Sequence, residues 1–178
     1  MTRTKEPPGG TSLYARVLPD VGGDTIWASM TAAYESLSDK MKAFLEGLKV
    51  VHTWDEAFPG RQIVLQRGGD FYLNHKFSNP PIKQPLIRTL PRTKMKIVNV
   101  NPAFSSHIIG LPPQESEGVL SFLFTLPTRS EFQYRHKWSE GTLAVWDNSA
   151  TQHAVVDDFF PAYRELTRVT FGGHGQPY

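Results

Sequence analysis

The sequence predicts a mainly β protein with inserted helices, built as a double-sheet jelly roll or a barrel. Short apolar segments recur along the chain, and 14 Gly and 14 Pro residues separate many of them. Only two stretches show the periodicity of helices. Many short strands with turn residues between them are typical of sandwiches and barrels. With 178 residues the chain is long enough to bury one core, so we expect a single domain over residues 1–178.

The chain begins with a predicted strand and a tight turn. Residues Ser12 to Leu18 alternate between apolar and polar side chains, which is typical of a half-buried strand. Pro19 ends this strand, since proline cannot donate a hydrogen bond to a neighbouring strand. The pair Gly22 and Gly23 then predicts a turn.

A helical pattern follows from Ser29 to Leu48. Its apolar residues recur at spacings of three and four, as one face of a half-buried helix requires. Ser38 can cap a second segment and Gly47 can close it, so we expect two short helices with a bend near Leu37. The apolar positions are Ala33, Leu37, Met41, Phe44, Leu45 and Leu48.

The segment from Trp54 to Lys83 predicts a long loop, because it has no clean period and contains several Gly and Pro residues. Long loops over a β scaffold are often lids or binding loops. Further on, a helix opens at Pro112 and Pro113, with proline in the first turn, where its missing N–H costs nothing. The remaining predicted strands are Pro85–Leu90, Lys96–Val100, Phe132–Trp138, Thr142–Trp146 and Arg164–Phe171.

Composition and charge exclude several classes of function. The net charge is only +2 and the basic residues are scattered, so no stripe is present that would neutralise the phosphates of a nucleic acid. The chain has no cysteine, which excludes disulfides, thiolate zinc sites and iron–sulfur clusters. A metal would therefore need imidazole and carboxylate ligands. Neither a signal peptide nor a long apolar run is evident, so we expect a soluble cytoplasmic protein without a membrane partner.

The densest group of chemically active side chains lies near the end of the chain. His153 follows the predicted strand that ends at Trp146, and Arg164 and Arg168 lie eleven and fifteen residues further on. A strand through both arginines would present them on one face. Two inward arginines are costly unless an anion lies between them. The pattern indicates an anion site beside an imidazole, but a structural histidine and two solvated arginines would give the same pattern.

Longer blocks of sequence narrow these possibilities. In order, they are GGDTIWAS, AAYESLS, FLEGLKVVH, PLIRTLP, VNPAFSSHIIGL, ESEGVLSFLF, EFQYRHKW and WDNSATQH. Together they cover nearly the whole chain, and they resemble the taurine dioxygenase (TauD/TfdA-like) family of Fe(II)- and 2-oxoglutarate-dependent dioxygenases. The resemblance implies a double-stranded β-helix, which is a jelly roll. It also implies an iron site of two histidines and one carboxylate, with 2-oxoglutarate and O2 as cosubstrates.

The resemblance assigns roles to five residues. His153 of WDNSATQH matches the distal histidine that binds the metal. Arg164 matches the arginine that binds the far carboxylate of 2-oxoglutarate, because a guanidinium donates two parallel hydrogen bonds to a carboxylate. Thr25 matches a hydroxyl that helps to bind the same carboxylate. Arg168 matches a position that contacts the acidic group of the substrate, and Phe58 a position that lines the substrate pocket.

The sequence departs from the family pattern at two points. The other two metal ligands of the family come from a His-x-Asp motif, and this sequence contains none, since His52 and Asp55 have the wrong spacing. Ser149 stands where many relatives carry arginine. In the family, the motif directly precedes the segment that matches MTRTKEPPGG. We therefore expect the chain to lack the N-terminal part of its domain, which leaves the jelly roll incomplete on that side.

Two functions remain open. The first is an Fe(II)/2-oxoglutarate-dependent dioxygenase that hydroxylates a small anionic substrate, sulfonate-like or carboxylate-like. With one visible metal ligand, this chain would bind iron poorly and would be inactive, either as a truncated gene product or as a natural short form. The alternative is a non-catalytic, degenerate jelly-roll module that binds an acidic metabolite or a partner subunit. An open sheet edge would also allow association into a homo-oligomer.

Overall fold

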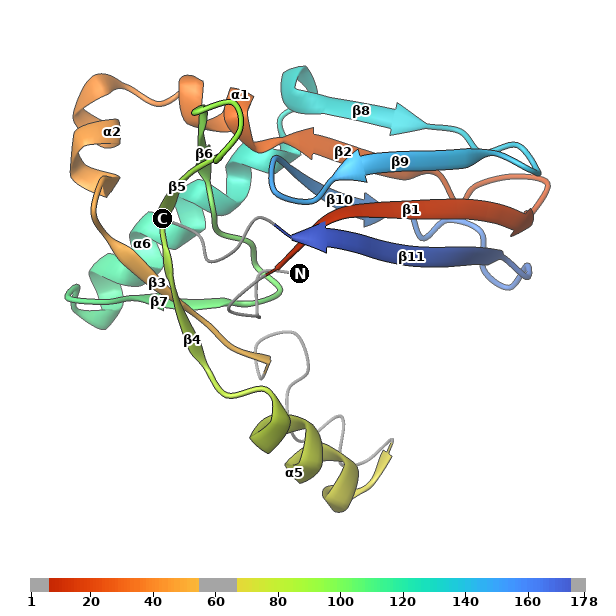
Figure 1. The fold of residues 1–178 in the computed structure, drawn as a ribbon, viewed down its shortest axis with the longest axis horizontal. Helices are drawn as coiled ribbons and strands as arrows, with labels where there is room; N and C mark the ends of the chain where they lie inside the picture. Colours follow the sequence, from red (N-terminus) through yellow and green to blue (C-terminus); the bar gives the residue numbers. More distant parts are fainter. Residues whose placement is uncertain (1–6, 55–66, 174–178) are drawn as a thin grey trace.

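Two three-stranded antiparallel sheets face each other in the computed structural model, which describes residues 7–54 and 67–173. Figure 1 shows their strands together at one end of the molecule. In the first sheet, β1 lies between β11 and β9, and in the second, β2 lies between β10 and β8. The strands are β1 (Pro8–Val17), β2 (Thr25–Ser29), β8 (Gln133–His136), β9 (Leu143–Asp147), β10 (Thr151–Val155) and β11 (Glu165–Gly173).

The inner faces of these sheets meet in a small core. Ala15 of β1 and Trp27 of β2 are buried there, together with Trp138, which follows β8. Ala15 lies opposite Leu166 of β11, so both strands turn this face toward the second sheet. The arrangement is a mainly β jelly roll with inserted helices, as the sequence predicts.

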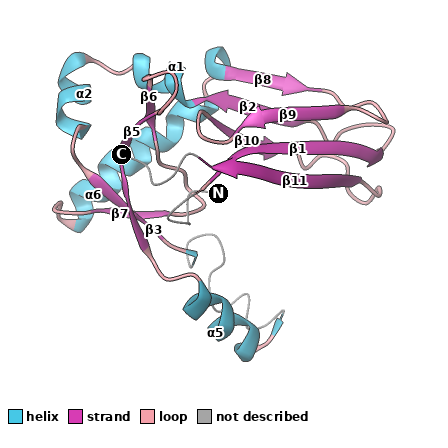
Figure 2. Ribbon diagram, viewed as in Figure 1, coloured by secondary structure: helices cyan, strands magenta, loops and turns pink. Residues whose placement is uncertain are grey.

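A larger hydrophobic core lies outside the sandwich, among the helices that Figure 2 shows at the opposite end. Leu45, Leu86 and Leu123 are fully buried in it. Each buried leucine side chain contributes roughly 1.5–3 kcal/mol, so this core supplies much of the stability. The surrounding elements are α1 (Met30–Glu35), α2 (Asp39–Leu45), β3 (Lys49–His52), β4 (Ile82–Pro85), β5 (Ile87–Thr89), β6 (Lys96–Val98), β7 (Ser105–Ile108) and α6 (Pro113–Thr125). Two short 3-10 helices, Leu126–Thr128 and Ser130–Phe132, follow α6.

The two predicted short helices are confirmed. The Ser29 hydroxyl accepts a hydrogen bond from the Ala32 amide at 3.2 Å and caps α1. Ser38 caps α2 in the same way. Gly47, with φ of 81°, adopts the left-handed conformation that closes the second segment. Among the described residues, no helix is both long enough and apolar enough to cross a bilayer.

The prediction of a loop from Trp54 to Lys83 is wrong in part. The described portion contains the helix α5 (Gly69–Ser78), which projects away from the other elements in Figure 1, and the start of β4. None of the described α5 side chains is buried. A helix without a buried face needs no apolar stripe, so nothing in the sequence indicated this helix. The predicted strand Pro85–Leu90 is two strands, because β4 ends at Pro85 and β5 begins at Ile87.

One histidine is completely buried in the helical part of the molecule. His52 of β3 has no exposed surface, and its Nε2 lies 3.4 Å from the Ser105 hydroxyl. Burial lowers the pKa of His52 from 6.5 to about 4, although a hydrogen bond to the backbone of Asn99 opposes this shift. His52 is therefore neutral in the folded protein near pH 7.

We predict that stability falls as the pH drops from 6.5 toward 4. In this range the unfolded chain binds a proton at His52 and the folded protein does not. Between pH 7 and pH 4.5, this difference removes about 2.5 kcal/mol from the free energy of unfolding. In urea titrations at pH 7 and at pH 4.5, the free energy of unfolding of His52→Gln should fall by about 2.5 kcal/mol less than that of the wild type. His107→Gln, at an exposed histidine of β7, is the matched control. Equal losses in wild type and His52→Gln would contradict the assignment.

Candidate functional site

The second sheet places several polar side chains on its inner face. Thr25 of β2 lies opposite His136 of β8. Two residues further along β2, Trp27 lies opposite His153 of β10. Residues directly opposite each other in an antiparallel pair point to the same face, as do residues two apart on one strand. Since Trp27 packs in the core between the sheets, Thr25 and His153 also point into that interior.

His153 lies where β10 forms one edge of the second sheet. Its ring packs edge-on against Trp146, with 4.9 Å between the ring centroids. Partial loss of solvation lowers the pKa of His153, and the positive charge of Arg168 adds to this effect. The neutral imidazole that results is the form that binds metals. In residues 7–54 and 67–173, however, no group of three or more His, Cys, Asp or Glu side chains is arranged to bind a metal ion.

Arg164 is a half-buried arginine without a hydrogen-bond partner at two of its nitrogens. Its Nε and Nη2 atoms are buried, and no described residue accepts from them. The guanidinium lies over the Phe159 ring, 5.5 Å from the centroid. Burial lowers the pKa of Arg164, and the negative charge of Asp24 opposes the shift. Because buried donors are costly without an acceptor, these two nitrogens are suited to donate to an anion.

The turn before β2 lies very close to the Arg164 side chain and requires a glycine. Gly23 has φ of 73°, and its amide donates a 2.8 Å hydrogen bond to the carboxylate of Asp158. A Cβ atom on Gly23 would lie 2.8 Å from Cδ and Nε of Arg164. Only glycine fits both the backbone conformation and this close approach without a shift of the arginine.

Two acidic side chains close to the site are paired with a different arginine. Arg135 donates from Nε to Asp24 at 2.7 Å, and its Nη2 lies 3.7 Å from Asp158. Arg135 carries one positive charge against two carboxylates, so it balances them only in part, and the charge of Asp24 still acts on Arg164. Asp158, although exposed, also accepts the hydrogen bond from the Gly23 amide.

Arg168 and Phe58 complete the predicted set. Arg168 lies on β11 opposite Leu13, two residues after Leu166, whose side chain packs in the core between the sheets. Its exposed side chain therefore belongs to the inner face and lies close enough to His153 to affect its pKa. Arg164 comes one residue before β11 begins. Phe58 lies outside the described residues.

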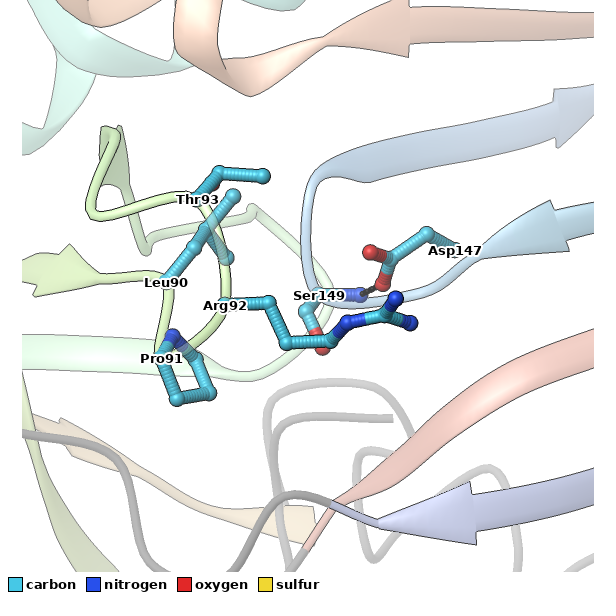
Figure 3. Close-up of a pocket in the computed structure, with 6 residues that line it drawn as sticks. All are labelled: Leu90, Pro91, Arg92, Thr93, Asp147 and Ser149. Carbon is cyan, nitrogen blue, oxygen red and sulfur yellow. Dashed lines mark hydrogen bonds between the residues drawn. The ribbon is translucent and has the colours of Figure 1, made fainter.

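A separate pocket of about 270 Å³ lies beside Ser149, and Figure 3 shows its lining. Its walls come from the turn at residues 90–93 and from Asp147 and Ser149. The amide of Ser149, which is buried, donates to Asp147 at 2.6 Å. The pocket contains none of the predicted site residues.

Arg88 of β5 is another buried arginine, and the sequence did not single it out. It is 3% exposed, and its Nε has no hydrogen-bond partner among the described residues. Burial lowers the pKa of Arg88, whereas the charge of Asp147 raises it. Arg88 is the central residue of the three-residue strand β5, and so short a strand shows no alternation in the sequence that would indicate burial.

Trp138 has a polar contact that its sequence context did not indicate. Aromatic residues in strands usually serve core packing, and Trp138 is indeed buried. Its indole nitrogen, however, donates a hydrogen bond to the Thr25 hydroxyl at 2.9 Å. The residue type alone could have indicated this contact, because a buried tryptophan usually needs an acceptor for its N–H.

Comparison with known proteins places these residues in a family context. A family model described as taurine catabolism dioxygenase TauD, TfdA family matches residues 1–170. An alpha-ketoglutarate-dependent sulfonate dioxygenase of Saccharomyces cerevisiae is 36% identical over 167 residues, which are 93% of this chain and 39% of the relative. An alpha-ketoglutarate-dependent 2,4-dichlorophenoxyacetate dioxygenase of Cupriavidus pinatubonensis is 35% identical over 158 residues, covering 89% of this chain and 53% of the relative.

A solved structure supports the same fold. The crystal structure of a taurine dioxygenase from Burkholderia xenovorans matches 99% of this chain and 60% of its own, with a TM-score of 0.82 and 32% identity. This likeness confirms the predicted jelly roll. The chain thus spans about two fifths to about one half of the length of the two curated relatives.

We predict that Gly23→Ala lowers the free energy of unfolding for two reasons. A control variant that shares only the first reason separates their contributions. The left-handed backbone at φ of 73° costs about 1 kcal/mol with alanine, and the new Cβ also meets Arg164. Gly47→Ala is the matched control, because Gly47 has φ of 81° and an added Cβ there would meet nothing within 4 Å. In urea unfolding, Gly23→Ala should lose about 1 kcal/mol more than Gly47→Ala. Equal losses would show that the approach of Arg164 does not constrain the turn.

Proposed function

The chain belongs to the taurine catabolism dioxygenase TauD, TfdA family, and from this premise we propose that it contains the 2-oxoglutarate-binding part of an Fe(II)-dependent dioxygenase. The observation that supports this most directly is the buried guanidinium of Arg164, whose Nε and Nη2 lack acceptors among the described residues. It lies against Gly23, two residues before Thr25.

The chemistry of this corner fits a dicarboxylate. Arg164 offers two N–H groups that can donate side by side to one carboxylate. Thr25, which is 3% exposed, adds a hydroxyl at the start of β2. Hydrogen bonds from a charged group are worth about 1.5–3 kcal/mol each, so binding by Arg164 dominates the affinity. The far carboxylate of 2-oxoglutarate would lie here, with its 2-oxo acid end directed toward His153.

His153 would supply one ligand for iron through its neutral imidazole. When bound, the iron would supply the reaction of O2 with the cosubstrate and the substrate. A single imidazole does not make a complete iron site, and the described residues contain no cluster of three metal-binding groups. The residues present therefore fit the cosubstrate well and the metal only in part.

The substrate would be a small organic anion. Arg168 is exposed on the inner face of β11, and its positive charge acts on His153. It would bind the sulfonate or carboxylate group of the substrate, and Phe58 would line the same space. The two curated relatives, named for sulfonates and for 2,4-dichlorophenoxyacetate, both act on acidic compounds. We propose a cytoplasmic location for this chemistry.

The alternative is a non-catalytic module that binds an acidic metabolite through the same corner. This alternative is supported by the finding that residues 7–54 and 67–173 contain no group of three side chains arranged to bind a metal ion. Both functions need Arg164 and Thr25, and they differ only in whether iron binds. Ligand binding and iron binding must therefore be tested separately.

We predict that the chain binds 2-oxoglutarate and that Arg164→Met weakens binding by about 10- to 100-fold, because two charged hydrogen bonds are lost. Dissociation constants would come from titrations followed by NMR. Arg129→Met is the matched control, since Arg129 is exposed and pairs with Glu131. If Arg164→Met and Arg129→Met had the same affinity, Arg164 would not be the anion-binding residue.

We also predict that the 178-residue chain forms no complete iron site. Under anaerobic conditions, Fe(II) with 2-oxoglutarate should give no visible charge-transfer band, because one histidine does not bind iron at useful affinity. The chain with Fe(II) alone provides the baseline spectrum. A strong band that His153→Ala abolishes would show that the chain does supply a full ligand set, and it would exclude the non-catalytic alternative.

A further inference from the structure

A hydrogen bond between two buried side chains links the end of β8 to the start of β2. Trp138 Nε1 donates to Thr25 Oγ1 at 2.9 Å. Trp138 is 7% exposed and Thr25 is 3% exposed, so water does not compete effectively for either group. The two residues are 113 positions apart in the sequence.

The direction of this hydrogen bond is fixed by chemistry. An indole N–H can only donate, so the Thr25 hydroxyl must be the acceptor. Its single proton then points away from Trp138. Among the described residues, no acceptor receives that proton. A buried donor without an acceptor costs about 1–3 kcal/mol, which a ligand can recover.

Two other buried nitrogens without acceptors belong to the arginine beside the turn that leads into Thr25. The Nε and Nη2 atoms of Arg164 are buried without acceptors in the described part of the chain, and the Arg164 side chain lies against Gly23, two residues before Thr25. The Arg164 nitrogens and the Thr25 hydroxyl together match a carboxylate, which accepts and does not donate. Another buried nitrogen without a partner among the described residues, Nε2 of His136, belongs to the residue opposite Thr25. A hydroxyl free to rotate would be a poorer partner, because it could direct a lone pair at the anion.

The Trp138 ring is held in place on two sides. His136 packs edge-on against it with 4.8 Å between the ring centroids, and Trp27 lies 6.3 Å away. By contrast, the indole nitrogens of Trp27 and Trp146 are buried without partners among residues 7–54 and 67–173. Of the indole N–H groups of Trp27, Trp138 and Trp146, only that of Trp138 has an acceptor among the described residues.

We propose that Trp138 is a positioning residue, which directs the hydroxyl proton of Thr25 at the far carboxylate of the cosubstrate. It acts through Thr25 and does not itself contact the ligand. This inference rests on the proposed function, because it assumes that Arg164 and Thr25 bind a carboxylate. It adds a residue that distinguishes a dicarboxylate from a 2-oxo acid without a second carboxylate.

The test is a double-mutant cycle on the 178-residue chain, with 2-oxoglutarate binding followed by NMR. Trp138→Phe keeps an aromatic ring but removes the N–H, and it should weaken binding about 5- to 10-fold. Thr25→Val removes the hydroxyl at nearly constant shape. In the Thr25→Val background, Trp138→Phe should change the affinity less than about 2-fold, because the group it orients is gone. Urea unfolding of each variant verifies that it is folded.

Three other outcomes would overturn the inference in different ways. If Trp138→Phe binds as well as the wild type, the inference fails and the proposed anion site stands. If Trp138→Phe weakens binding equally with and without the Thr25 hydroxyl, Trp138 acts by packing alone. If the wild type does not bind 2-oxoglutarate, the proposed function itself fails, and the inference with it.

Discussion

The approach of the Gly23 backbone to Arg164 connects the two sheets at the candidate site. The Gly23 amide donates to Asp158 at 2.8 Å, which ties the turn before β2 to the connection between β10 and β11. That turn leads directly into Thr25, and the connection leads directly into Arg164. The hydrogen bond therefore joins the two segments that lead into Thr25 and Arg164, while the strands themselves are held by pairing within their sheets.

Charged groups around this corner bear on the proposed binding of an anion. Arg135 pairs with Asp24 and Asp158 and offsets one of their two negative charges, while Arg164 keeps two buried donors without acceptors in the described part of the chain. Such an arrangement costs stability, because buried donors lose their bonds to water. The larger core among the helices, with fully buried residues such as Leu123, offsets that cost at a distance. Stability and ligand chemistry thus depend on different parts of the molecule.

Local signals in the sequence predicted the parts that local interactions determine. Ser29 and Ser38 cap their helices through amides three residues away, so the two helices could be found from spacing alone. The strand that contains His153 was not predicted, because β10 has little apolar alternation. The contact between Gly23 and Asp158 spans 135 residues, and no local pattern could reveal it. Resemblance to a family identified Thr25 and Arg164, but not the indole bonded to Thr25.

The closest pair of indoles between the sheets has an optical consequence. Trp27 of the second sheet and Trp146 of the first lie 5.2 Å apart across the sandwich, at an angle of 65° between their rings. Chromophores this close share their excited states, which produces paired bands of opposite sign in circular dichroism. The intensity of such a couplet depends steeply on ring separation and orientation. The protein therefore contains an intrinsic, label-free gauge of the spacing between its two sheets.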